Sequence, residues 1–108
     1  MTKRIEDLKV IGNKRINNDF FILELSGNTR IPEFKPGQFV QVKVEGSPDT
    51  FLRRPISIHD VDYGKNTFKI LIQIAGKGTR ALSKLDNGDM LNLIYPLGNS
   101  FSLPSLEE

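Results

Sequence analysis

The chain has 108 residues, which is the size of one domain and leaves no room for a second of ordinary size. Its 15 lysines and arginines against 13 aspartates and glutamates give a formal net charge of +2, which is too small by itself to indicate a nucleic-acid-binding protein. Because it contains no cysteine, disulfides, thiolate zinc sites and iron–sulfur clusters held by this chain are excluded.

The first residues, from Met1 to Asp7, are mostly charged or polar and lack the continuous apolar stretch of a secretory signal. No later apolar run reaches the length of a membrane span. We therefore expect a cytoplasmic, soluble protein that binds neither membranes nor nucleic acid.

Apolar and polar residues alternate along most of the chain, which is typical of strands with one face on a core. In chain order, the pattern predicts strands at 8–15, 20–25, 38–45, 56–62, 67–75 and 90–95. Turn residues separate several of these strands, at 17–19, 36–37 and 63–66. The clearest apolar faces belong to the third and fifth strands and consist of Val40, Val42, Val44, Phe68, Ile70, Ile72 and Ile74.

Residues 79–85 depart from this alternation, because Leu82 and Leu85 are three apart, and they predict one short helix. We expect Thr79 to cap its start and Asn87-Gly88 to follow its end. The fold class is then all-β, an antiparallel barrel or sandwich that is closed or nearly closed. The barrel domain is expected to span residues 1–99, and residues 100–108 are expected to leave it as a tail.

Two segments carry residues suited to an anionic ligand. At the start of a strand, Arg54 could hold a phosphate by two-point contact and Ser57 could present a hydroxyl to a ring nitrogen. Residues 76–80, Gly-Lys-Gly-Thr-Arg, stand between a strand and the helix, where glycine lets the backbone approach a ligand and N–H groups are unpaired. Together they supply what a flavin dinucleotide needs. Taken singly, each has a plainer explanation, a chain turn or a solvated basic pair before an edge strand.

Other residues suggest no chemistry. His59 is the sole histidine and receives no role, and no metal cluster or serine–histidine–aspartate set can be assembled around it. No catalytic residue and no metal ligand is predicted within this chain. The phenylalanines Phe20, Phe21, Phe39 and Phe68 are expected in the core.

Four stretches resemble the flavin-binding domain of the ferredoxin reductase-like family: 35–40 (KPGQFV), 53–58 (RRPISI), 76–79 (GKGT) and 95–99 (YPLGN). More narrowly, they resemble the electron transfer subunits of NAD-dependent dihydroorotate dehydrogenase, which belongs to pyrimidine biosynthesis. The resemblance implies a six-stranded antiparallel Greek-key barrel with one short helix and FAD as cofactor. It also implies that electrons pass between a catalytic dehydrogenase subunit and NAD in the full assembly.

The resemblance also assigns residues to the FAD site. The family pattern R-x-Y-S covers Arg54, Pro55, Ile56 and Ser57, so that Arg54 would contact the FAD phosphates and Ser57 the reactive edge of the isoalloxazine. Ile56 replaces the common tyrosine, as is usual in the dihydroorotate branch, and removes an aromatic stacking partner. The remaining assignments are Leu71, Ile72 and Gln73 to the strand beside the flavin, and Gly78 and Thr79 to the pyrophosphate-binding helix start.

The second half of the family has no counterpart in the sequence. It consists of a nucleotide-binding domain with a glycine-rich loop and, in this branch, a cysteine-rich segment that holds a two-iron cluster. We therefore expect a fragment, a truncated gene product or one piece of a split assembly, which is an oxidoreductase component and does not catalyse the complete reaction alone.

Two other functions stay open at this point. One is a small barrel that binds single-stranded nucleic acid through Arg53, Arg54, Lys77 and Arg80. The other is a non-catalytic interaction module whose flavin site has lapsed.

Overall fold

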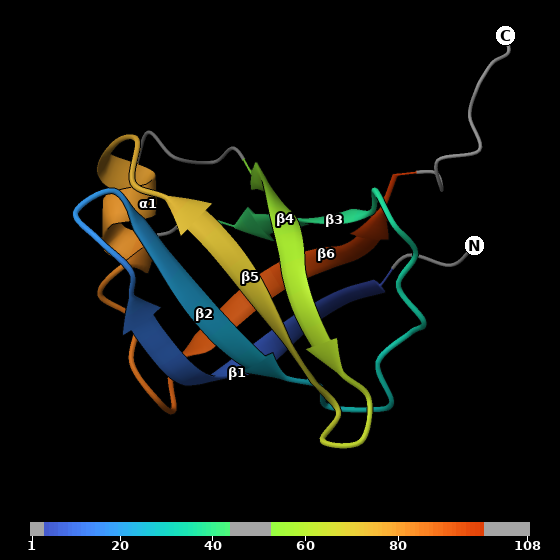
Figure 1. Cartoon of the computed structure of the whole chain (residues 1–108). Coiled ribbons are helices and arrows are strands. Elements are labelled where there is room, and N and C mark those ends of the chain that lie inside the picture. The colour runs from blue at the N-terminus through green and yellow to red at the C-terminus, as the bar shows by residue number, and fades with distance from the viewer. Residues whose placement is uncertain (1–3, 44–52, 99–108) are drawn as a thin grey trace, which may run out of the picture.

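The computed structural model describes residues 4–43 and 53–98, which form a closed β-barrel with one short helix (Figure 1). The elements are β1 (Arg4–Arg15), β2 (Phe20–Ser26), β3 (Phe39–Lys43), β4 (Arg53–Asp62), β5 (Thr67–Gln73), α1 (Lys77–Leu82) and β6 (Met90–Leu97). The strands follow one another around the barrel in the order β1-β2-β5-β4-β3-β6, and every neighbouring pair is antiparallel. The predicted six-stranded antiparallel barrel with one helix is confirmed.

Four strands, β1, β2, β4 and β6, are longer than predicted, and β5 ends at Gln73, two residues before its predicted end. β1 begins at Arg4 rather than Leu8, and its added residues pair with β6, from Arg4 opposite Tyr95 onward. The alternation missed this start because Ile5 points outward with 67% of its surface exposed, out of phase with the buried Leu8 and Val10. The last residues of the predicted third strand, 44–45, and the whole predicted tail, 100–108, lie outside the described residues.

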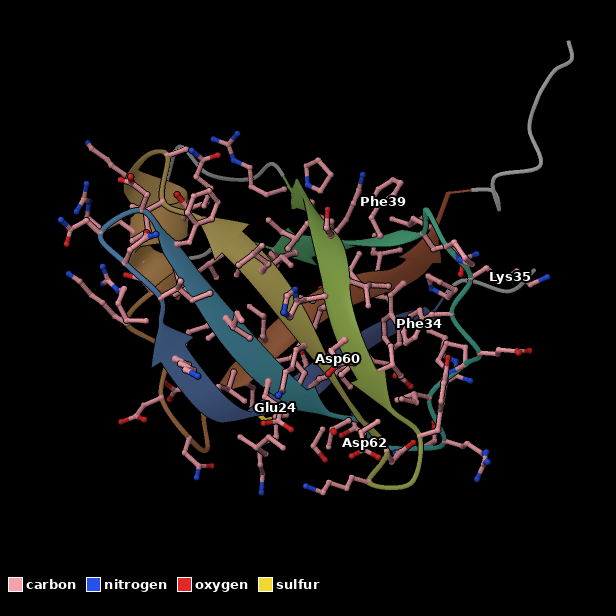
Figure 2. The ribbon with its side chains drawn as sticks, in the orientation of Figure 1. Glu24, Phe34, Lys35, Phe39, Asp60 and Asp62 are labelled. Atoms are coloured by element: carbon pink, nitrogen blue, oxygen red, sulfur yellow. The ribbon has the colours of Figure 1, made fainter. Side chains whose placement is uncertain are left out.

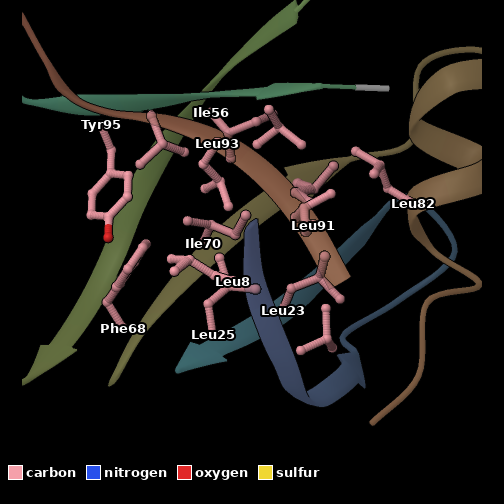
Figure 3. Close-up of a cluster of buried hydrophobic side chains, with 14 of the residues drawn as sticks. Leu8, Leu23, Leu25, Ile56, Phe68, Ile70, Leu82, Leu91, Leu93 and Tyr95 are labelled. Carbon is pink, nitrogen blue, oxygen red and sulfur yellow. The ribbon is translucent and has the colours of Figure 1, made fainter. Parts of the chain in front are cut away.

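The core fills the inside of the barrel, where strands contribute alternate residues (Figure 3). The predicted apolar faces of β3 and β5 are confirmed for five residues that are at most 1% exposed: Val40, Val42, Phe68, Ile70 and Ile72. Ile74 follows the end of β5 and is partly buried against the core, and Val44 lies outside the described residues. Phe21 is also fully buried. The expectation for the other two phenylalanines is wrong, because Phe20 and Phe39 are half-buried on the outer faces of β2 and β3.

The phenol of Tyr95 lies in this core beside Phe34 and Phe68, with ring centroids 6.1 and 5.5 Å away. Its hydroxyl donates a hydrogen bond of 2.5 Å to Oε1 of Glu6. Burial, and after it the neighbouring Glu6 carboxylate, raises the pKa of Tyr95 well above its usual range. The hydroxyl therefore stays protonated as a donor at neutral pH.

The helix begins at Lys77, two residues before the predicted start, and Gly76 rather than Thr79 occupies its N-cap. The capping prediction for Thr79 is therefore wrong. The Thr79 hydroxyl instead accepts a hydrogen bond of 2.7 Å from the Ala75 N–H and donates one of 3.3 Å to the Gly76 carbonyl. It thus ties the end of β5 to the first turn of α1.

The predicted turns are confirmed. Gly37 adopts a φ of 87° in a turn closed by the Gln38 N–H, which donates to the Lys35 carbonyl over 3.1 Å. Before β2, the side-chain oxygen of Asn17 accepts hydrogen bonds of 2.8 and 3.0 Å from the N–H groups of Asp19 and Phe20. These bonds fix the direction in which the chain enters β2.

Candidate functional site

The start of β4 and the end of β5 separate from each other at the end of the barrel that carries α1 (Figure 1). The two strands pair from Ser57, opposite Leu71, down to Asp62, opposite Thr67. Upstream of Ser57, β4 pairs with β3 but not with any described residue of β5. Pro55 stands in this one-sided stretch, where its missing N–H costs least. The separation opens a groove on the outer face of the barrel.

The groove has a volume of about 440 Å³ and draws its walls from β2, β4, β5 and α1. Its lining consists of Phe20, Arg54, Pro55, Ile56, Ser57, Leu71, Gln73, Ala75 and Thr79. Most of the predicted site residues are thus brought together, although the two segments that contain them lie about twenty residues apart in the chain. The exceptions are Ile72 and Gly78, which do not line the groove.

Both exceptions have a structural reason. Ile72 is fully buried and faces the core, so its side chain cannot reach a ligand in the groove. Gly78 is buried in the first turn of α1, next to Thr79. Ile56 is an intermediate case, because it borders the groove while its side chain is 9% exposed and packs in the core cluster (Figure 3).

The two neighbouring arginines have different environments. Arg53 donates hydrogen bonds to the Gln41 carbonyl and to the side-chain oxygen of Asn92, which tie β4 to β3 and β6. Arg54 is exposed and makes no hydrogen bond or ion pair with any residue in the described ranges. Since the described lining contains no carboxylate, the Arg54 guanidinium is available for an anion.

The connection from β5 to α1 leaves the backbone accessible. Gly76 is extended, with a φ of 166° that any residue can adopt, and a Cβ added there would meet no atom within 4 Å. Lys77 and Arg80 on α1 are exposed and add positive charge at this end of the barrel. Exposed backbone and nearby cations fit the phosphate groups of a dinucleotide.

A second hollow of about 440 Å³ adjoins the groove. Its lining consists of Gly37, Gln38, Phe39, Pro55, Ile56, Ser57 and Ile58. Since Pro55, Ile56 and Ser57 border both hollows, the start of β4 forms a ridge between them. Figure 2 shows Phe39 on the outside of the barrel beside this ridge.

Carboxylates gather toward the other end of β4. Glu24, Asp60 and Asp62 share one small depression there, together with Lys65 and Lys69 (Figure 2). Within residues 4–43 and 53–98, no group of three or more histidine, aspartate or glutamate side chains could hold a metal ion. The same residues include no helix that is long and apolar enough to cross a membrane.

Two residues that line the groove, Phe20 and Ala75, were not predicted as site residues. In the adjoining hollow, the residues that were not predicted are Gly37, Gln38, Phe39 and Ile58. A signal for Phe20 exists in the sequence. If Phe21, Leu23 and Leu25 form the core face of β2, the alternation places Phe20 on the outer face. Because two phenylalanines are adjacent, both were expected in the core, although only one of them can lie on the inner face of the strand.

Comparisons with known proteins agree on one family. Residues 7–101 match the family of oxidoreductase FAD-binding domains. A relative from Lysinibacillus sphaericus, the electron transfer subunit of dihydroorotate dehydrogenase B (NAD(+)), is 37% identical over 105 residues, which cover 97% of this chain and 40% of the relative. The subunit of the same name from Bacillus mycoides is 36% identical over 102 residues, 94% of this chain and 39% of the relative.

A similar fold occurs in the solved structure of an NADH-dependent reduced ferredoxin-NADP oxidoreductase, with a TM-score of 0.75 and 26% identity. The match covers 86% of this chain and 33% of that one. The chain therefore spans about 40% of the length of the curated relatives and a third of this structure.

Proposed function

The chain belongs to the family of oxidoreductase FAD-binding domains, and from this premise we propose that it binds FAD in the groove between β4 and β5. The observation that carries the proposal is that one groove is lined both by Arg54 of β4 and by Thr79 of α1. The groove therefore borders both segments, 53–58 and 76–79, whose sequences predict a pyrophosphate site.

Each part of the groove has a role in this proposal. Arg54 holds a phosphate, and the backbone from Gly76 to Thr79 approaches the pyrophosphate. Ser57 donates or accepts a hydrogen bond at the flavin edge, while Leu71 and Gln73 line its side. Ile72 contributes through its backbone position. The cofactor would supply the redox chemistry, which is the acceptance and release of electrons by the isoalloxazine.

The larger assembly is also part of the proposal. We place the chain as the FAD-binding part of an electron transfer subunit that serves a catalytic dihydroorotate dehydrogenase subunit and passes electrons to NAD. Support comes from the names and the 36–37% identity of the relatives, of which this chain spans about 40%. Residues 1–99 would form the domain, with 100–108 leading toward an NAD-binding and iron–sulfur portion. The expected cytoplasmic location can be tested by cell fractionation.

A nucleic-acid-binding barrel is less well supported by these contacts. That function would require Arg53, Arg54, Lys77 and Arg80 to contact the phosphates of a nucleic acid. The Arg53 guanidinium already donates hydrogen bonds to Gln41 and Asn92. It is therefore less available for a phosphate than Arg54.

Titrations with FAD and riboflavin, followed by visible absorption, test the site. Arg54→Ala should weaken FAD binding by about 1.5 to 3 kcal/mol, the usual contribution of a charged hydrogen bond. Riboflavin, which has no phosphate, should bind the variant and the wild type equally. Arg30→Ala removes the same charge from an exposed loop position outside the groove and is the matched control.

The wild type should also prefer FAD over riboflavin. Equal FAD affinity of Arg54→Ala and the wild type would remove Arg54 from the site. An equal loss for riboflavin would show that the variant disturbs the groove rather than a phosphate contact.

A further inference from the structure

Among the described residues that line the groove, Phe20 alone has an aromatic side chain. Its backbone is fixed on both sides. The N–H donates to the side-chain oxygen of Asn17 over 3.0 Å, and the carbonyl accepts a bond of 3.0 Å from the Ile16 N–H. One residue earlier, the Asp19 carbonyl accepts a 2.7 Å hydrogen bond from the Ile74 N–H at the end of β5. The ring is therefore carried by a rigid position beside β5.

The side chain points away from the core. Phe21, Leu23 and Leu25 occupy the inner face of β2, and Phe20, which alternates with them, is half-buried and does not belong to the core cluster. No contact with the core explains why a large apolar ring stands at this outward position. Its exposed surface instead forms part of the groove wall.

The neighbours of Phe20 complete a surface of mixed chemistry. Across the β2–β5 pair it lies opposite Gln73, and two residues along β5 Leu71 lies opposite Ser57 of β4. Residues two apart on one face of a strand are separated by about 7 Å. An aromatic ring, an amide, an alkyl group and a hydroxyl thus line one stretch of the groove.

This surface matches one part of a flavin dinucleotide. A planar ring system with an apolar benzenoid edge and a hydrogen-bonding edge can pack on Phe20 and Leu71 and still reach the polar groups of Gln73 and Ser57. Adenine is smaller and has no apolar edge of that kind. We infer that Phe20 is a ring-binding residue that packs against the isoalloxazine, an inference that rests on the proposed FAD site.

The test compares Phe20→Leu with the wild type by titration with FMN, FAD and ADP. Loss of the aromatic contact should weaken FMN and FAD binding by about threefold to tenfold and reduce the quenching of flavin fluorescence on binding. ADP should bind both proteins equally. Phe20→Tyr keeps the ring and should bind FMN like the wild type. Ile16→Ala shortens an exposed apolar side chain at the same turn outside the groove and is the matched control.

Several results would overturn the inference. Equal FMN affinity of Phe20→Leu and the wild type would remove Phe20 from the ring site while leaving the FAD site intact. A loss for ADP with unchanged FMN binding would assign Phe20 to adenine instead. If the wild type binds no flavin, the proposed function fails as well. Thermal unfolding of each variant without ligand shows whether a loss of binding reflects a loss of fold.

Discussion

At the scale of single residues, two adjacent side chains of the same type can have different contacts. Arg53 and Arg54 have the same side chain, yet Arg53 ties β4 to β3 and β6 while Arg54 has no partner among the described residues. Sequence alone could identify the basic pair but could not divide it, because the division depends on which strands flank β4. Phe20 and Phe21 point to opposite faces of β2, and there the alternation with Leu23 and Leu25 does contain the information that separates them.

Tyr95 gives a residue-scale prediction about alkaline stability. Burial first, and then the hydrogen bond with Glu6, raises its pKa in the folded state above the unfolded value of about 10. The stabilisation that follows is fully present below pH 10 and is lost as the pH rises above 10 toward the folded pKa. Replacing Tyr95 by phenylalanine removes the hydroxyl and with it this pH dependence.

Urea unfolding of Tyr95→Phe and the wild type at a series of pH values checks this prediction. The variant should be less stable at pH 8 by about 1.5 to 3 kcal/mol, the usual contribution of a hydrogen bond to a charged group. The difference should shrink between about pH 10 and pH 11. Stability curves that run parallel over this range would contradict the assigned role of the Tyr95 hydroxyl.

At the scale of elements, the groove follows from strand pairing. β4 pairs with β3 from Arg53 to Ser57 and with β5 from Ser57 to Asp62. Pro55 therefore lies in a stretch that pairs with β3 and with no described residue of β5. The alternation within β3 and β5 was strict enough to predict their core faces from sequence. The point at which two strands part depends on register across the sheet, and no local pattern encodes it. The sequence therefore predicts the two segments that form the groove walls, but it does not predict that the strands separate between them.

The connection from β5 to α1 gives a prediction at this scale. Thr79→Val keeps the shape of the side chain but leaves the Ala75 N–H without the hydroxyl that it now donates to. We expect a loss of about 1 kcal/mol in the free energy of unfolding and weaker FAD binding, because the turn that would approach the pyrophosphate in the proposed site loosens. Thr79→Ser keeps the hydroxyl and is the matched control.

Urea unfolding and FAD titration of both variants test this connection. Thr79→Ser should retain the stability and the FAD affinity that Thr79→Val loses. If the two variants behave alike, the methyl group rather than the hydroxyl matters at this position, and the proposed link between β5 and α1 is wrong.

At the scale of the whole molecule, charge is distributed unevenly along β4. Glu24, Asp60 and Asp62 lie toward one end together with lysines. Arg54, Lys77 and Arg80 lie at the end with the groove and have no ion-pair partner among the described residues. Uncompensated positive charge beside a groove attracts an anionic ligand. The composition could not reveal this, because the net charge of +2 averages over both ends.

The central claim is that FAD occupies the groove between β4, β5 and α1. Amide chemical shifts of the whole chain, followed by NMR during titration with FAD, test it most directly. The largest changes should fall at 54, 56–57, 71–75 and 76–79, with little change at Glu24, Asp60 and Asp62. Changes concentrated at those three carboxylates, or no change at a saturating FAD concentration, would contradict the account.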